Sequence, residues 1–348
     1  MNRKHFVALD SLRGFAALFV VSFHMLPFWP AWLMVDFFFA LSGFVLAHTY
    51  LYSGRETSGL EFIFHRLARL YPLHVFALAF FILAYVATRH QLPEYADGRL
   101  YTFLQHLTLT HSIGMHTTDQ TWNGPSWSVS VEFWVSILFF FFIKKSTPSI
   151  YLFIIASICL LAIYNNSDFG LLVVTENYYG IFNSGMVRCV CLFLCGVLTY
   201  RAYIVLQYSD RLLERTPWNF LELLSILSVV FIILARRKSQ SDIDLFAPPV
   251  FMMLILVFAF DKGWISHLLR RTLYLGKLSY SVYLNHVPVI YLVFFLLSPE
   301  KFGFGVSFLS AYVATLILSH FTYQFIEQPS RRGIRALGNF FERELRQS

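Results

Sequence analysis

Charged residues are scarce in this sequence. Asp, Glu, Lys and Arg make up 14% of its 348 residues, whereas a soluble domain carries about 25%. Hydrophobic residues make up 57%, and they include 39 Phe and 19 Tyr. This composition excludes a disordered chain, a coiled coil and almost any ordinary soluble enzyme, and it predicts a membrane protein.

Cysteine is scarce as well. The sequence has four Cys, and Cys189, Cys191 and Cys195 share one apolar segment without a C-x-x-C spacing. A disulfide framework and a zinc site are therefore not predicted, and no metal is expected. The net charge is +7, but the basic residues are scattered, which favours a cytoplasmic membrane surface over nucleic acid as a partner.

Long apolar runs are abundant. A membrane-spanning helix needs about 20 mostly apolar residues, and ten segments approach this length and composition. The predicted fold class is therefore an all-α polytopic membrane protein with about ten transmembrane helices. The predicted spans are Phe15–Pro30, Trp32–Tyr50, Pro72–Thr88, Ser128–Ile143, Ile150–Tyr164, Met186–Tyr200, Leu221–Ala235, Pro249–Phe260, Tyr280–Ser298 and Gly305–Phe325.

Basic residues are concentrated on one side of these spans. If the N-terminus is inside, most of the 27 Lys and Arg fall in inner segments, as the positive-inside rule requires. We therefore expect both termini in the cytoplasm and one membrane-embedded domain over residues 1–348, without an appended soluble domain. The longest outer segment, residues 89–127, contains His90, His106, His111 and His116, which are expected to be solvated.

Ionisable residues inside a span are costly, so each is a candidate for function. Arg13 and His24 in the first span are eleven residues apart, which places them on nearly the same helical face and about 16 Å apart along the axis. Arg13 would lie at the cytoplasmic rim and His24 deep in the bilayer. The alternative is a buried His24 that only hydrogen-bonds a neighbouring helix.

A carboxylate follows one hairpin later. Asp36 begins the second span near its outer end, where it could pair with His24, fix the imidazole tautomer and raise its basicity. The alternative is a carboxylate that only stabilises the start of a helix.

Two arginines precede the third span. Arg66 and Arg69 share a helical face at i,i+3, and Pro72 is expected in the first turn of the span. Two guanidinium groups at the cytoplasmic rim are suited to phosphate. Alternatively, they are anchors of the positive-inside kind.

The outer start of the fourth span is rich in Ser and Trp. Ser126 or Ser128 could cap a helix that carries Glu132 into the apolar layer. Glu132 is then either functional or part of a capping arrangement. Trp127 could belong to an interfacial aromatic belt or form a stacking surface for a sugar ring.

The ninth and tenth spans also carry polar residues. Tyr283 and His286 share a face of the ninth span at i,i+3. Glu327 ends the last span on the predicted cytoplasmic side, where a structural ion pair with a nearby Arg is expected.

Six segments, taken in order, resemble the acyltransferase 3 family of multi-pass membrane acyltransferases, which includes enzymes that O-acetylate bacterial surface polysaccharides. The resemblance covers nearly the whole chain, and Val129 departs from it because the family usually has Leu there. The matching segments are Leu9–Ala17 with His24, Asp36–Phe44, Arg66-x-x-Arg69-x-x-Pro72, Trp127–Glu132, Leu275–His286 and Glu327-x-Pro329.

The resemblance implies an acyl-CoA donor, usually acetyl-CoA, and an acceptor hydroxyl on a glycan or a lipid-linked sugar. It also points to His24 with Arg13, and to Arg66 with Arg69, as functional positions. The expected partners are acyl-CoA, a carbohydrate acceptor and membrane lipid, without nucleic acid, and a homo-oligomer is left open. The expected location is the bacterial inner membrane.

We therefore predict an O-acetyltransferase in which His24 is the general base on the acceptor hydroxyl. A covalent acyl-His24 intermediate is the alternative chemistry. An alternative function is a transporter or flippase that uses the same intramembrane polar residues. Three further roles are predicted. Asp36 or Glu132 would orient the His24 imidazole, and Arg13, Arg66 and Arg69 would bind the donor phosphates. The acceptor would contact Trp127, Tyr283 and His286.

Overall fold

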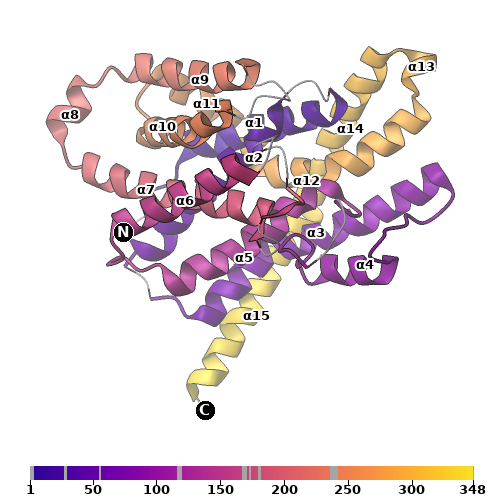
Figure 1. Ribbon diagram of the computed structural model, residues 1–348, viewed down its shortest axis with the longest axis horizontal. Helices are drawn as coiled ribbons and strands as arrows, with labels where there is room; N and C mark the ends of the chain where they lie inside the picture. The colour runs from indigo at the N-terminus through magenta and orange to yellow at the C-terminus, as the bar shows by residue number, and fades with distance from the viewer. Residues whose placement is uncertain are drawn as a thin grey trace. The chain divides into compact units, whose positions relative to one another are not determined.

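A computed structural model of the chain describes residues 4–26, 30–54, 56–115, 120–166, 171, 174–178, 182–235 and 242–347. Ten of the helices in these ranges are long and apolar enough to cross a membrane, which confirms the predicted all-α polytopic fold. The helices follow one another with little other regular structure (Figure 1). His116 lies outside the described residues.

The chain divides into two compact units, each built from two stretches of sequence. Unit 1 comprises Met1–Arg55 and Phe142–Ser279, and unit 2 comprises Glu56–Phe141 and Tyr280–Ser348. The long helix α12 (Leu273–Leu296) contributes its first turns to unit 1 and the remainder to unit 2.

Unit 1 is organised around the contact between α2 and α7. A Cβ atom on Gly43 would lie 2.0 Å from the carbonyl oxygen of Phe193, and one on Gly196 would lie 1.8 Å from that of Ala40. Only glycine at both positions allows the two backbones to touch, as at many membrane helix interfaces. The elements of unit 1 are α1 (Val7–Met25), η1 (Ala31–Leu33), α2 (Met34–Leu46), η2 (Ala47–Leu51), α6 (Ser149–Asn166), β1 (Asn177–Tyr178), β2 (Phe182–Asn183), α7 (Ser184–Leu206), α8 (Asp210–Arg215), α9 (Trp218–Ala235), η5 (Asp242–Phe246), α10 (Ala247–Phe260), α11 (Trp264–Leu269) and η6 (Arg270–Thr272).

Unit 2 is organised around one long helix. Helix α3 (Gly59–Arg89) contacts α15, and the rings of Phe62 on α3 and Phe140 on α5 stack with their centroids 4.2 Å apart. The other elements of unit 2 are α4 (Arg99–Leu107), η3 (Gly124–Ser126), α5 (Trp127–Phe142), α13 (Pro299–Phe302), α14 (Phe304–Thr322), η7 (Tyr323–Glu327) and α15 (Gln328–Gln347).

The predicted bounds of two spans are wrong. Helix α1 ends at Met25, because Leu26 precedes Pro27 and a residue before proline is driven out of the helical region. His24 therefore lies in the last turn of α1. Helix α3 begins at Gly59, where the side chain of Ser58 accepts a hydrogen bond from the Glu61 backbone N–H at 3.1 Å. Pro72 consequently lies inside α3 and not in its first turn.

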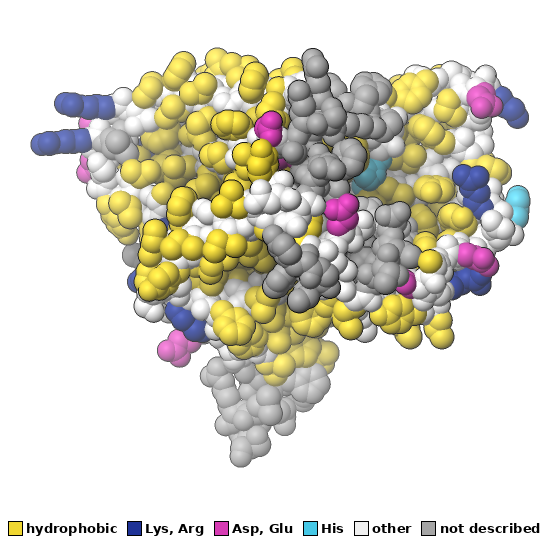
Figure 2. All heavy atoms as spheres, viewed as in Figure 1, with side chains coloured by type: hydrophobic (Ala, Val, Ile, Leu, Met, Phe, Trp, Pro, Cys, Tyr) yellow, Lys and Arg dark blue, Asp and Glu magenta, His cyan; other side chains and the backbone are white. Residues whose placement is uncertain are grey.

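Apolar side chains cover most of the face of the protein in Figure 2, and charged side chains there are few. Helices α6 and α9 have mostly outward-facing residues, such as Ile158 and Leu234 with 60% and 65% exposure. Such surfaces are suited to the hydrocarbon of a bilayer, in which helices satisfy their backbone hydrogen bonds internally. The chain is therefore built as an integral membrane protein.

Candidate functional site

Helix α1 of unit 1 presents the first predicted pair. Because α1 is continuous from Val7 to Met25, the eleven-residue spacing keeps Arg13 and His24 within about 20° of one helical face and about 16 Å apart. The side chain of His24 is exposed. His24 therefore has an exposed side chain in the last turn of α1, and its predicted depth in the bilayer stays a prediction.

The start of α1 holds several polar side chains in place. Asp10 Oδ2 lies 2.7 Å from Nε2 of His5, and Asp10 Oδ1 lies 3.5 Å from Nη1 of Arg13. Lys4 donates a hydrogen bond to the hydroxyl of Tyr203 at 2.7 Å, and burial lowers the pKa of the Lys4 ammonium group. The basic residues at this end of α1 therefore have defined positions.

Two distant sequence segments meet at this point of unit 1. A Cβ on Gly276 of α12 would lie 2.0 Å from the carbonyl oxygen of Asp10, and one on Gly14 would lie 2.7 Å from the backbone carbonyl carbon of Leu275. The two glycines allow α1 and α12 to cross at backbone contact. At this crossing the Leu9–Ala17 segment contacts the start of the Leu275–His286 segment. Lys277 follows Gly276 directly, and its side chain is exposed.

Asp36 has a different partner from the one that the sequence suggested. The Nε and Nη2 atoms of Arg188 on α7 donate to Oδ1 and Oδ2 of Asp36 at 2.7 and 2.8 Å. Arg188 also donates to the carbonyl oxygens of Leu171 and Trp32, and both ionic side chains are almost completely buried. Within the described residues Asp36 makes no hydrogen bond to His24, so the predicted carboxylate–imidazole pair is wrong. Asp36 holds α2 to α7.

Arg66 and Glu132 form an ion pair inside unit 2. Nη2 of Arg66 lies 2.7 Å from Oε1 of Glu132, and the side chains are 5% and 16% exposed. Arg66 is seven residues beyond the start of α3, or about 10 Å along the helix. Its guanidinium is buried and paired with Glu132, so it is not open to a phosphate here, whereas its predicted position at the cytoplasmic rim stays a prediction.

Arg69 differs from Arg66 although it lies on the same face of α3. Its side chain is half-buried. Among the residues that the structure describes, Arg69 makes no side-chain hydrogen bond or ion pair. Arg66 and Arg69 were both predicted to bind phosphate. Of these two, Arg69 is the one whose N–H groups donate to no described protein group.

The three predicted acceptor-binding residues are buried in unit 2. Trp127 and Tyr283 are 7% and 6% exposed, and His286 is fully buried. The Tyr283 hydroxyl donates to the carbonyl oxygen of Pro125 at 2.9 Å and lies 2.8 Å from Oγ of Ser128. The structure therefore brings Tyr283 to the start of α5, next to Trp127, whereas an exposed stacking surface at Trp127 is not present.

Glu327 has the structural role that its position predicted. Its Oε1 lies 2.8 Å from Nη2 of Arg331, one helical turn later, and its Oε2 accepts a hydrogen bond from Ser281 Oγ at 2.9 Å. These contacts join η7 to the polar stretch of α12.

Sequence reasoning missed two groups of residues. Arg188 was hidden because an arginine inside an apolar span gives no signal of its partner 152 residues away. His106 and His111 were expected to be solvated, but both are buried and lie beside His74. The H-x4-H spacing at the end of a helix was the available signal. His90, by contrast, is exposed as expected.

Comparison with known proteins identifies the family of the chain. A family model described as "Acyltransferase domain" matches residues 6–323. The chain therefore belongs to the acyltransferase 3 family, and its described residues include ten helices that are long and apolar enough to cross a membrane.

One curated relative is "Protein 2 in picA locus" of Rhizobium radiobacter, which is 53% identical over 95 residues. The matched residues are 24% of this chain and 49% of the relative. The chain therefore spans about half the length of that relative. No solved structure matches the chain.

Proposed function

We propose that this membrane acyltransferase moves an acetyl group from cytoplasmic acetyl-CoA to a hydroxyl of a surface or secreted carbohydrate. The observation that carries the proposal is the α1 stripe, in which an exposed His24 and an ordered Arg13 share one face about 16 Å apart. Family membership supplies the acyl-transfer chemistry. The proposed location is the bacterial inner membrane.

His24 is the proposed general base. Its imidazole removes the proton of the acceptor hydroxyl as the oxygen attacks the thioester carbonyl carbon. The carbon–sulfur bond then breaks, the proton passes from the imidazolium to the CoA thiolate, and an ester and free CoA leave. An acyl-His24 intermediate would divide the same bond changes between two steps. His24 suits either route because its ring is exposed at the end of α1.

The donor phosphates are proposed to bind guanidinium groups. Arg13 is ordered at the start of α1 and retains 21% exposure. Arg69 has donors that no described protein group occupies. Charge-assisted, forked hydrogen bonds make arginine well suited to phosphate. Arg66 is assigned a different task, since its guanidinium holds Glu132, the remaining candidate for an acid–base or charge-balancing group.

The acceptor is proposed to approach the start of α5 in unit 2. Trp127, Tyr283 and the buried His286 supply aromatic surface and a hydroxyl there. Small-molecule sites are lined mainly by hydrophobic and aromatic side chains with a few placed polar groups. In this proposal Trp127 must become accessible when the acceptor binds.

Transfer of label tests the function. Membranes that contain the protein receive acetyl-CoA labelled in the acetyl group, with a crude polysaccharide as acceptor. We expect base-labile label in the glycan fraction, and a loss of about 100-fold or more in the His24→Ala variant. The matched control is His267→Ala, which removes another exposed histidine of unit 1.

Two outcomes contradict the proposal. Full transfer by His24→Ala would remove His24 from the chemistry, whereas failure of that variant to accumulate would assign it a structural role. Label that stays on CoA with the wild-type protein would overturn the acetyl-transfer function itself.

The proposed orientation has a separate test. Both termini are proposed to be cytoplasmic, because the inner segments then hold most Lys and Arg. A reporter fused after the last residue should be cytoplasmic, and one inserted at the exposed Ala96 between α3 and α4 should be extracytoplasmic. Reporters that lie on the same side would refute this topology.

A further inference from the structure

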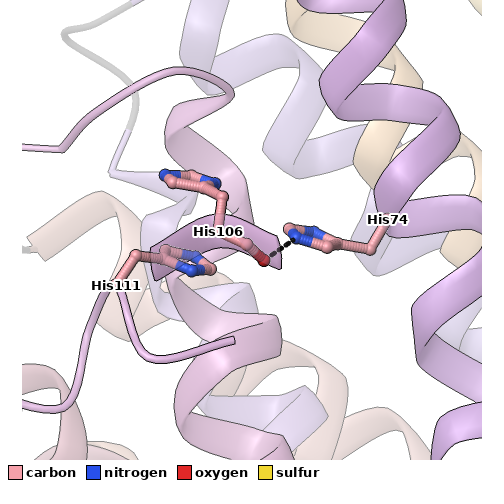
Figure 3. A group of neighbouring side chains, drawn as sticks. All are labelled: His74, His106 and His111. Atoms are coloured by element: carbon pink, nitrogen blue, oxygen red, sulfur yellow. Dashed lines mark hydrogen bonds between the residues drawn. The ribbon is translucent and has the colours of Figure 1, made fainter. Parts of the chain in front are cut away.

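Three buried histidines converge in unit 2. His74 belongs to α3, His106 to the last turn of α4, and His111 to the loop that follows (Figure 3). Their side chains are almost completely buried, with residue exposures of 1%, 0% and 4%. Each offers a ring nitrogen, and these three atoms all lie within 4.8 Å of one another.

The backbone is arranged to bring two of these rings together. Helix α4 ends in a reversal at Leu109, whose φ of 57° is unusual for leucine, and the Thr110 N–H donates to the Gln105 carbonyl oxygen at 2.9 Å. The Leu109 carbonyl oxygen accepts hydrogen bonds from Ser130 Oγ at 2.6 Å and Trp134 Nε1 at 2.9 Å, both on α5. Contacts from α5 thus hold a conformation that leucine disfavours.

The result is a face-to-face pair of imidazoles with a third ring beside it. The His106 and His111 rings are 3.7 Å apart between centroids and tilted by 10°. His74 reaches toward them from α3, and its ring is parallel to that of His111 within 4° at 5.7 Å. Figure 3 shows the His74 ring pointing at the carbonyl oxygen of His106.

Hydrogen bonds fix the tautomers of two rings. His74 Nε2 lies 2.9 Å from the carbonyl oxygen of His106, and His111 Nε2 lies 3.0 Å from that of Ser126. A carbonyl oxygen can only accept, so both Nε2 atoms carry the proton and the Nδ1 atoms of the neutral rings present lone pairs. Nδ1 of His74 is buried without a hydrogen-bond partner among the described residues. His106 Nε2 is held by Thr121 Oγ1 at 3.0 Å.

This arrangement matches a metal site more closely than a packing cluster. Metal-binding histidines almost always donate their other N–H to a carbonyl or carboxylate, which orients the ring and its lone pair. Three neutral imidazoles bind Zn²⁺, Cu²⁺, Ni²⁺ or Co²⁺, and Zn²⁺ accepts a tetrahedral set with one further oxygen. Ser126 Oγ lies 3.5 Å from His106 Nδ1, so it or a water molecule beside that ring could supply that oxygen.

We propose that His74, His106 and His111 bind one divalent transition-metal ion, with Zn²⁺ as the best fit. Tetrahedral Zn²⁺ places its nitrogen ligands at about 2.0–2.1 Å and hence about 3.3 Å from one another. The three atoms now lie within 4.8 Å of one another and the rings are nearly parallel, so binding requires the rings to turn until each nitrogen lone pair points at the ion. The burial of all three rings makes the site structural, and the ion clamps α3 to the end of α4 and the loop before α5. The proposal does not depend on the acetyl-transfer function.

Metal content of the purified protein tests the site. The protein is expressed in Zn²⁺-supplemented medium, purified in detergent through a tag without histidine, and analysed by plasma mass spectrometry after exchange into chelator-treated buffer. We expect one Zn²⁺ per chain. His106→Ala and His111→Ala should lose the ion, and the control variant His267→Ala should keep it.

Two further variants guard against loss of folding. His74→Gln removes the ring but leaves a side-chain amide that can donate to the His106 carbonyl oxygen. We expect this variant to accumulate and yet bind Zn²⁺ at least about 100-fold more weakly, because even a residue that only orients a ligand contributes about 10- to 100-fold. Thr121→Val removes the hydroxyl beside His106 and should fall in that 10- to 100-fold range.

Wild-type protein also gives a readout that needs no mutation. Co²⁺ introduced into the chelated protein should give the intense visible absorption of tetrahedral coordination, and Zn²⁺ should displace it and raise the unfolding temperature. If the wild-type chain binds no more Zn²⁺, Co²⁺, Ni²⁺ or Cu²⁺ than the His106→Ala variant, the proposal is overturned. The three rings would then be a hydrogen-bonded cluster only.

Discussion

Among the described residues, two buried arginine–carboxylate pairs join separate helices, one in each unit, and they are built differently. In unit 1, Arg188 donates two hydrogen bonds to Asp36 and further ones to two carbonyl oxygens, and both side chains are almost completely buried. In unit 2, Arg66 donates one hydrogen bond to Glu132. The Arg66 Nε is buried without a hydrogen-bond partner among the described residues.

This difference in hydrogen bonding distinguishes an ion pair that holds helices together from one that belongs to the candidate functional site. A buried ion pair offsets its desolvation only when geometry is good and the remaining donors and acceptors are satisfied. The Asp36–Arg188 pair meets this condition, as expected for a link between two helices. The Arg66–Glu132 pair meets it only in part, and its Glu132 side chain retains 16% exposure. A buried donor without a partner, here Arg66 Nε, needs an explanation, and a role in the reaction is one such explanation.

The largest effect should come from breaking the complete pair. Arg188→Ala leaves the fully buried carboxylate of Asp36 without its partner, which costs about 3–5 kcal/mol. We expect little folded protein, as measured by yield and by unfolding temperature in detergent. The double variant Asp36→Leu with Arg188→Met removes both charges and should recover much of the loss. Normal stability of Arg188→Ala alone would show that the pair does not hold α2 to α7.

The incomplete pair should show the opposite pattern, with a loss of activity but little loss of stability. Glu132→Gln keeps an acceptor for Arg66 and should change the free energy of unfolding by about 1 kcal/mol. Its turnover should fall by about 100-fold or more if the carboxylate takes part in the reaction. Label transfer and unfolding temperature are measured on the same preparation. Unchanged turnover would reduce this pair to a structural contact.

A smaller effect should distinguish the two arginines of α3. Arg69→Ala removes charge-assisted hydrogen bonds to phosphate, at about 1.5–3 kcal/mol, which is roughly a 10- to 150-fold loss of acetyl-CoA affinity. Calorimetric titration in detergent measures this loss.

The donor acetyl-pantetheine lacks the nucleotide phosphates and serves as the control for this prediction. With it, the turnover difference between wild type and Arg69→Ala should largely disappear. Arg66→Ala should remain defective with both donors, because its proposed task is to hold Glu132. If Arg69→Ala binds CoA as tightly as wild type, the donor phosphates bind elsewhere.

The smallest effect should come from an exposed pair in unit 2. Arg99 and Glu94 lie 3.1 Å apart, but their side chains are 44% and 86% exposed. Water and salt screen such a pair, so Glu94→Gln should change stability by about 0.2–1 kcal/mol at most. The same unfolding assay in detergent measures this change in stability, which is then compared with the changes for the two buried pairs. A loss as large as that of Arg188→Ala would mean that burial does not control these energies.

The spans were predictable from sequence because each depends on local composition. A run of apolar residues must form a helix in lipid whatever its neighbours are, and the ten predicted segments correspond to the ten observed ones. The errors fell at helix ends, as at Met25 and Gly59, where a single proline or a serine cap decides the boundary. The Glu327–Arg331 pair was predictable for the same reason, since it lies within one helical turn.

The partners of Asp36 and Arg66 were not predictable in this way. Each ion pair joins helices that are far apart in sequence, and the periodicity of one helix does not identify the helix that packs against it. The histidines were missed for a related reason. A polar loop is usually solvated, and only the reversal at Leu109, held by α5, buries His111 against His106.

The Asp36–Arg188 pair also has a consequence for how the chain is made. The two residues are 152 positions apart, and synthesis at about 5–20 residues per second separates their appearance by about 8 to 30 s. During this interval α2 carries a carboxylate whose partner does not yet exist, and an unpaired charge is costly in lipid. Insertion of α2 is therefore more costly before α7 emerges than after it, and a chain that ends before Arg188 keeps that cost.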